Sequence, residues 1–285
     1  ARIDINETKE APMDFALWKS AKPNEPSWES PWGKGRPGWH IECSAMCLKH
    51  LGKTIDIHCG GKDLMFPHHE NEIAQSEAAN DAPFARFWLH NGYIDVDNKK
   101  MSKSLNNFFT VREVAAAYGY EPIRMLLISA HYRSPINYST EGIEQSKAAL
   151  ERLYTCLNNL DFMQANAADG KKPGEDDILN KLYKRREQFI EAMDDDFNTA
   201  DALAAIFDLA KDINININTM SGPSKELIAG AKALFTELCG VLGILSASRD
   251  DKIDGEIEAL IEKRQAARKA KDFKAADEIR DTLKE

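Results

Sequence analysis

The sequence lacks several features that would place it in other classes of protein. No apolar run in its 285 residues approaches the length of a membrane-spanning helix, and no signal peptide precedes Ala1. Positive charge is not in excess, because 46 acidic residues outnumber 37 basic residues and the net charge is −9. We therefore expect no membrane partner, and the bulk charge gives no support for binding to RNA.

A closely spaced, even set of cysteines is also missing. The five cysteines are an odd number and lie far apart, which favours reduced thiols or metal ligands over a disulfide framework and predicts a cytoplasmic protein. The chain opens on Ala1-Arg2-Ile3-Asp4, with neither an initiator methionine nor a capped element. We expect an internal, monomeric fragment of a longer protein, with about one to three domains.

The most informative stretch is Lys100-Met101-Ser102-Lys103-Ser104, in which two lysines and two hydroxyls surround one apolar residue. Residues 88–96 before it are typical of a strand and a turn, and residues 105–107 after it of a loop. A basic loop at the edge of a sheet can close on a polyphosphate, with lysine as a point charge and hydroxyls as donors. Taken alone, however, two lysines at this spacing more often form a solvated turn.

A possible metal site lies upstream of this stretch. A helix is predicted to start at Pro67, so His68 and Glu72, four residues apart, project from one face. Cys43 can add a third ligand from the preceding segment. Zinc is bound by thiolate, imidazole and carboxylate groups of this kind.

Other ligand sets remain open at this point. His69 and Glu72 are three residues apart and also face one way, and His58 or Cys59 can join either set. Histidine and cysteine are also often simply buried without a ligand. Residues 54–61 are predicted to form a buried strand that ends in a glycine turn. Asp63 follows it and can bind a substrate ammonium or a nucleotide hydroxyl, or can equally cap the turn.

Three stretches carry a resemblance to a known family. The stretch 100–104 matches the KMSKS signature of class I aminoacyl-tRNA synthetases, and residues 30–46 and 60–77 look like the cysteinyl-tRNA synthetases. The resemblance extends over nearly all of the chain and is weaker beyond residue 200. It implies that L-cysteine and ATP, with Mg²⁺, form cysteinyl-adenylate, and that cysteine then passes to the 3′ end of tRNA(Cys).

The resemblance also implies roles for individual residues. Lys103 matches the ATP-binding lysine of the signature, and Lys100 is its weaker catalytic partner. Trp39 matches a tryptophan of the cysteine pocket. The residues that match the zinc ligands of the family are Cys43, His68 and Glu72, with a further ligand expected upstream of this chain.

One motif of class I synthetases is not found. His40-Ile41-Glu42-Cys43 begins like their HIGH tetrad, but Glu42 and Cys43 stand where glycine and histidine are required, so we reject the match. The first half of the nucleotide-binding fold is therefore expected to be absent. On that basis the fragment alone should not adenylate cysteine and should bind zinc weakly.

The chemistry of the substrate explains why zinc suits such a site. Cysteine differs from serine by one atom, and an apolar pocket discriminates such differences only about 10–200-fold, whereas translation needs about 10⁴–10⁵. Zinc prefers a soft ligand such as thiolate to a hydroxyl oxygen. Zinc would therefore select the substrate thiol.

The predicted fold is α/β followed by an all-α region. We expect the C-terminal half of a class I Rossmann-type catalytic domain with the signature loop over residues 1–105. A stem-contact fold is expected over 106–150, and a truncated helical domain of the tRNA anticodon-binding type over 151–285. The isoleucines at 213, 215 and 217 alternate as in a strand, but we favour the end of a helix that starts near Ala200.

Several basic positions can contact RNA, although solvation or packing explains them equally well or better. Arg124 and the run His131-Tyr132-Arg133 belong to the predicted stem-contact fold. A helical hairpin predicted over 257–283 carries a further cluster of lysines and arginines.

Two alternative functions are kept. A cysteine ligase of the mycothiol pathway resembles the same catalytic half but joins cysteine to an amino sugar, and the long helical region argues against it. The second alternative is a non-catalytic, helical RNA-binding protein. Cysteine-dependent pyrophosphate exchange would exclude it.

Overall fold

The computed structural model describes residues 9–96, 99–101 and 109–246, and the single positions 260, 263, 264, 275, 279 and 282. Residues 102–104 of the signature and most of the hairpin predicted over 257–283 lie outside the described residues. The chain first forms a small antiparallel pair, in which β1 (Trp18–Ser20) lies beside β2 (Gly35–Pro37).

A parallel β-α-β unit follows the first helix. Strand β3 (Ile55–Gly61) pairs in parallel with β4 (Ala85–Asn91), and Ile57 lies opposite Phe87 in the register. The helical segments between the two strands and α1 before them carry most of the candidate site. In chain order the elements are α1 (Ile41–Leu51), β3 (Ile55–Gly61), a 3₁₀ turn (Lys62–Leu64), a π-helical turn (Met65–His69), α2 (Glu70–Asn80) and β4 (Ala85–Asn91).

The strand predicted over residues 54–61 is confirmed, but the prediction that it is buried is wrong. Ile55 is 5% exposed, whereas Ile57 is 50% exposed and its neighbour Phe87 is 65% exposed. Side chains alternate between the two faces of a strand. His58 therefore faces the opposite way from Ile57 and packs against His69 and Trp88. Ile55 lies on the same face as Ile57, so among the described residues this face of β3 is covered at Ile55 and open at Ile57.

The helix expected from Pro67 is present in altered form. The regular α2 begins only at Glu70, and Phe66 before it has φ −136° and ψ 133°, outside the helical range. The first turn is therefore irregular.

A three-stranded sheet with two helices joins this unit to the helical part of the chain. Strand β5 (Ile94–Val96) lies in the centre, antiparallel to β6 (Lys99–Lys100) and parallel to β7 (Ile136–Tyr138). The elements are β5 (Ile94–Val96), β6 (Lys99–Lys100), α3 (Val111–Tyr118), α4 (Tyr120–Ile128) and β7 (Ile136–Tyr138). Thr110 and Glu113 form a complete capping box that starts α3.

Four long helices follow: α5 (Thr140–Asn166), α6 (Glu175–Asp194), α7 (Thr199–Asn216) and α8 (Lys225–Val241). The N-cap side chains of Ser139, Asn198 and Ser224 each accept a backbone hydrogen bond, a contribution of about 1 kcal/mol apiece. Helix α5 is continuous across the predicted domain boundary between residues 150 and 151.

The bundle core is apolar. The fully buried members at 0% exposure include Leu153, Leu160, Leu182, Ile206, Leu209, Ile213, Ile217, Ile228, Ala231 and Phe235. Ile213 and Ile217 lie inward and Ile215 is 54% exposed. This is the helical spacing, so the prediction of a helix over the alternating isoleucines is confirmed.

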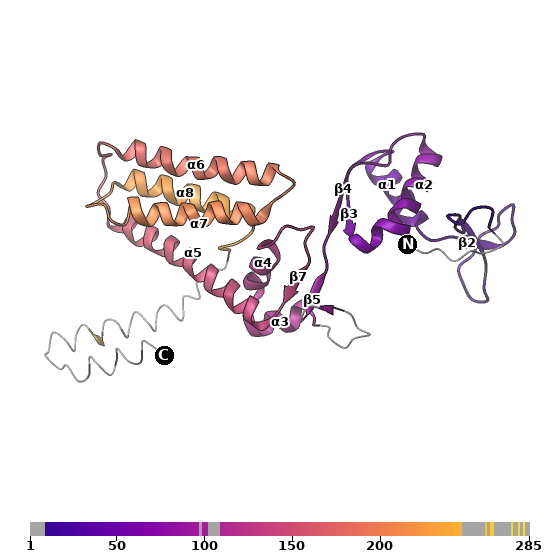
Figure 1. Cartoon of the computed structure of the whole chain (residues 1–285), viewed down its shortest axis with the longest axis horizontal. Helices are drawn as coiled ribbons and strands as arrows, with labels where there is room; N and C mark the ends of the chain where they lie inside the picture. Colours follow the sequence, from indigo (N-terminus) through magenta and orange to yellow (C-terminus); the bar gives the residue numbers. More distant parts are fainter. Residues whose placement is uncertain are drawn as a thin grey trace.

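The overall arrangement is elongated. Figure 1 shows α5 to α8 packed together at one end and β3, β4, α1 and α2 toward the other, with the β5–β7 sheet, α3 and α4 between them. The predicted fold class, α/β followed by all-α, is confirmed. Among the described residues, we find no helix with both the length and the apolar character that crossing a bilayer requires.

Candidate functional site

The residues predicted as zinc ligands line one pocket between α1 and α2. The pocket has a volume of about 290 Å³, and Cys43, His68 and Glu72 all line it together with Trp39. Cys43 comes from the first turn of α1, His68 from the π-helical turn and Glu72 from the first turn of α2. The structure therefore brings these four predicted site residues together.

Three aromatic rings form one wall of the pocket. The Trp39 ring stacks on His40 with centroids 5.3 Å apart, and its edge meets His68 at 4.9 Å. His40 precedes α1 with φ 76°, in the left-handed region, and is buried. Burial, followed by the neighbouring His68, lowers the pKa of His40, so its imidazole is neutral at pH 7. Trp39 is 71% exposed and forms the outer rim.

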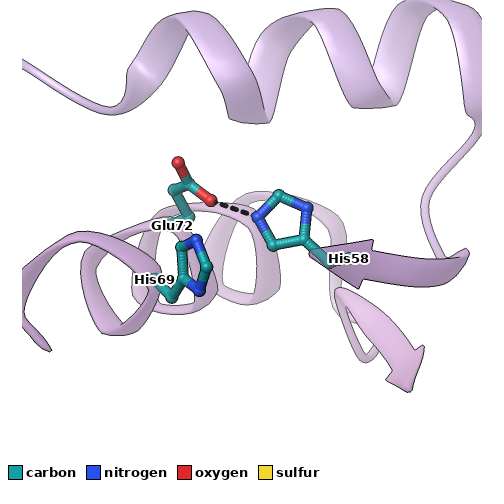
Figure 2. A group of neighbouring side chains, drawn as sticks. All are labelled: His58, His69 and Glu72. Atoms are coloured by element: carbon teal, nitrogen blue, oxygen red, sulfur yellow. Dashed lines mark hydrogen bonds and ion pairs between the residues drawn. The ribbon is translucent and has the colours of Figure 1, made fainter. Parts of the chain in front are cut away.

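Glu72 is the carboxylate at the base of the site. It is only 6% exposed, and its Oε2 lies 2.7 Å from Nε2 of His58, as Figure 2 shows. A buried carboxylate requires a hydrogen-bond partner or a cation. His58 on β3 supplies a partner from fourteen residues away.

The most compact group of possible metal donors differs from the predicted one. One donor atom each from His58, His69 and Glu72 lies within 4.8 Å of the other two, and Figure 2 shows the three side chains converging. This group was one of the alternatives that the sequence left open, and it shares Glu72 with the predicted set. Nδ1 of His69 also lies 2.8 Å from Nε2 of His90. A side chain at Gly60 would collide with His69 at 2.7 Å, so glycine permits this arrangement.

Two thiols of α1 experience the charge of Glu72. Burial, and then Glu72, raises the pKa of Cys43 to about 11, and the same causes in the same order raise the pKa of Cys47. The site therefore combines thiol, imidazole and carboxylate donors around one buried acid. This is the donor chemistry that zinc takes in proteins, and the residues fit such an ion.

Buried polar contacts hold the two helices in register. Gln75 Nε2 donates to the carbonyl of Trp39 at 3.3 Å, and Ser44 Oγ donates to Gln75 Oε1 at 3.4 Å. Sequence reasoning missed Gln75, Ser44 and His40. The buried polar residues Glu72, Gln75 and Ser76 recur at helical spacing on α2, and that periodicity was the available signal.

The other predicted site residues lie elsewhere. Asp63 is exposed in the 3₁₀ turn and does not line the pocket, so its substrate role stays a prediction. Lys100 ends β6, which is an edge strand, and the amide of Met101 donates to Ile94 O at 3.0 Å. The first residue of the signature therefore belongs to an edge strand. Lys103 lies outside the described residues, and its role stays a prediction.

Comparison with known proteins supports the resemblance. The model of the tRNA synthetases class I (C) catalytic domain matches residues 1–148, a DALR domain matches 188–246, and a cysteinyl-tRNA ligase anticodon binding domain matches 250–285. The chain is 54% identical over 286 residues to the cysteine--tRNA ligase of Caldicellulosiruptor saccharolyticus. The match covers 100% of this chain and 61% of that protein.

A solved structure shares the fold. It is the ternary LeuRS-tRNA-LeuAMS complex of Agrobacterium radiobacter K84, with a TM-score of 0.58 and 18% identity over 77% of this chain and 34% of that one. Because the catalytic-domain model alone matches more than half of the chain, this protein belongs to the class I (C) family of tRNA synthetases.

Proposed function

We propose that the full-length protein is a cysteine–tRNA ligase, which activates L-cysteine with ATP and transfers it to tRNA(Cys). The observation that carries the proposal is the pocket in which Cys43, His68 and Glu72 meet beside Trp39. A relative 54% identical bears that name, and the anticodon-binding model covers residues 250–285. The chain spans 61% of the length of this relative.

Cys43, His68 and Glu72 would hold the zinc ion. When bound, zinc supplies a soft Lewis acid that prefers the sulfur of cysteine to the hydroxyl of serine. His58 holds the Glu72 carboxylate in place through its 2.7 Å contact. Trp39 forms the rim and excludes water from one side of the substrate.

The activation step needs positioning and charge neutralisation. The carboxylate of cysteine attacks the α-phosphate of ATP, pyrophosphate leaves, and no protein nucleophile is required. We assign Lys103 to neutralise the leaving pyrophosphate, with Lys100 as the weaker partner and Mg²⁺ bound to the nucleotide. Donors of this kind stabilise a transition state by about 3–4 kcal/mol each.

The wider setting follows from the same assignment. The partners are tRNA(Cys), L-cysteine and ATP, the protein is monomeric, and it works in the cytoplasm. A mycothiol-type ligase is disfavoured because helical and anticodon-binding domains match residues 188–285 apart from a short gap. A non-catalytic RNA-binding protein is disfavoured by the catalytic-domain match.

Pyrophosphate exchange into ATP, measured with the full-length protein, tests the proposal. Cysteine should support exchange at least about 10³-fold better than serine, and tRNA rather than an amino sugar should accept the activated cysteine. No cysteine-dependent exchange would refute the proposal. Transfer to the amino sugar alone would establish the mycothiol-type alternative.

A further inference from the structure

One carboxylate joins the helical bundle to the central sheet. Asp196 lies in the turn between α6 and α7, and three consecutive residues of the loop between α4 and β7 converge on it. Tyr132 donates its hydroxyl to Oδ1 at 2.8 Å, Arg133 Nη2 lies 2.5 Å from Oδ2, and His131 Nε2 lies 3.6 Å from Oδ2. The run His131-Tyr132-Arg133, considered from sequence as a phosphate contact, is therefore engaged within the protein.

The backbone of the turn presents Asp196 to this loop. Asp196 and Phe197 both have left-handed φ values, 56° and 55°. Two adjacent residues other than glycine adopt this conformation only where their surroundings hold them. A further contact from the same loop supports the turn, since Thr199 Oγ1 donates to the carbonyl of Ala130 at 3.4 Å.

The other side of Tyr132 holds the sheet. Its carbonyl accepts a hydrogen bond from the amide of Gly92 at 2.7 Å, in the short link between β4 and β5. A Cβ atom at Gly92 would lie 2.4 Å from the backbone of Ser134, so glycine is required for this close approach. One residue thus bonds to the bundle through its side chain and to the sheet through its backbone.

The contacts continue from Gly92 to the signature. Strand β5 pairs with β6, and Asp95 lies opposite Lys100 in the register. Met101, the next residue, donates to the carbonyl of Ile94 at 3.0 Å. A connected path of hydrogen bonds and intervening backbone therefore runs from Asp196 through Tyr132, Gly92 and Ile94 to Met101, the second residue of the signature.

We propose that Tyr132 and Asp196 form a joint that couples the position of the helical bundle to the strands from which the signature leaves. Asp196 is a positioning residue in this account, since it acts through Tyr132. The role of this joint in catalysis, in which tRNA bound to the helical region sets the position of the signature, rests on the proposed function. The mechanical coupling between the bundle and the strands does not depend on the proposed function.

The chemistry of the joint suits a permanent contact. Burial raises the pKa of Tyr132, and the Asp196 carboxylate beside it acts in the same direction, although Arg133 opposes both. The phenol therefore stays protonated and continues to donate at neutral pH. An ordinary packing contact would stabilise the turn without affecting the sheet, and this difference can be measured.

Amide hydrogen exchange on the 285-residue chain, without ATP, cysteine or tRNA, tests the joint. In Asp196→Asn we expect exchange at the amides of Gly92 and Met101 to rise on the order of tenfold, because a charge-assisted hydrogen bond is weakened. Asp195→Asn is the matched control, since Asp195 is exposed in the same turn, and it should leave both amides at the wild-type rate.

Tyr132→Phe provides the second variant, because it removes only the hydroxyl. It should raise exchange at Gly92 and Met101 in the same way, while the amide of Ile217 in the bundle stays protected. Tyr120→Phe, at a tyrosine that is 68% exposed, serves as its control. Wild-type exchange at Gly92 and Met101 in Tyr132→Phe would overturn the joint, whatever Asp196→Asn does to the bundle. Failure of the ligase assay would leave this result unchanged.

Discussion

The two ends of the molecule bury different kinds of side chain. The helical bundle buries leucine, isoleucine and phenylalanine, and Phe235 and Leu153 among them are fully enclosed. The α/β end, residues 9–101, buries mainly polar side chains, including His69, Glu72 and Gln75. Its only apolar residues in the buried class, among those the structure describes there, are Ile55, Phe84 and Val96.

This difference in burial assigns stability and reactivity to different parts of the molecule. Apolar burial is the main favourable term in folding, whereas a buried polar pair contributes little net free energy but fixes a geometry. The bundle is therefore expected to dominate the free energy of unfolding, and the α/β end to carry the reactive groups. Four substitutions test this contrast, in order of decreasing effect.

The largest loss of stability should come from the bundle core. Phe235→Ala removes a ring that is 0% exposed, and we expect the free energy of unfolding to fall by about 3–5 kcal/mol because a cavity remains. Urea denaturation measures this. Phe162→Ala, at a position on α5 that is 72% exposed, should change it by less than about 0.5 kcal/mol. Equal losses would remove the contrast.

Replacing the signature lysine Lys103 should reduce activity without reducing stability, the opposite of a substitution in the bundle core. In the full-length protein, Lys103→Ala is expected to slow pyrophosphate exchange about 10²–10³-fold with little change in cysteine affinity or in stability. Lys181→Ala, an exposed lysine on α6, is the control and should leave exchange unaltered. A loss of cysteine affinity as large as the loss of rate would remove Lys103 from the transition state.

An intermediate effect is expected at Glu175, a carboxylate that is 1% exposed at the start of α6. Burial alone raises its pKa, but hydrogen bonds from Lys172 and Ser224 outweigh burial and lower the pKa below 4.5. Its contribution to stability is therefore present above about pH 4.5 and is lost as the pH falls through the folded-state pKa. Glu175→Gln should lower the free energy of unfolding at pH 7 by roughly 1–3 kcal/mol.

The pH dependence distinguishes this effect from a general loss of helix stability. The difference between Glu175→Gln and wild type should shrink when unfolding is measured below pH 4. Asp177→Asn, an exposed acid in the same helical turn, should show a much smaller change. A difference that stays constant with pH would assign the effect to packing.

The smallest effect on the free energy of unfolding is expected when isoleucine is replaced by valine at one position in each region. Ile213→Val in the bundle, at a 0% exposed position, should cost about 0.5–1.5 kcal/mol. Ile57→Val on the open face of β3, at 50% exposure, should cost less than about 0.5 kcal/mol. The reverse order would show that the face of Ile57 is covered in solution.

The features that sequence predicted are those with local signals. The helix through Ile213 and Ile217, the strand over residues 55–61 and the meeting of His68 with Glu72 all follow from short periodicities. The signature stretch at residues 100–104 predicted the family. Pairings across long separations could not be predicted, because tertiary packing alone chooses the partner.

Two such pairings shape the account. His58 and Glu72 are fourteen residues apart, and Tyr132 and Asp196 are sixty-four apart. The exposure of Ile57 was missed for a related reason, since the sequence of a strand does not reveal which elements cover each of its faces. The compact donor group around His69 was visible only as one alternative among several.

Zinc content of the full-length protein tests the central assignment most directly. Metal analysis should find about one zinc per chain in the wild type and in Cys59→Ser, because Cys59 is exposed and outside the pocket lining. Cys43→Ser should reduce the content at least about tenfold, since a thiolate ligand is lost. Full zinc occupancy in Cys43→Ser would contradict the site.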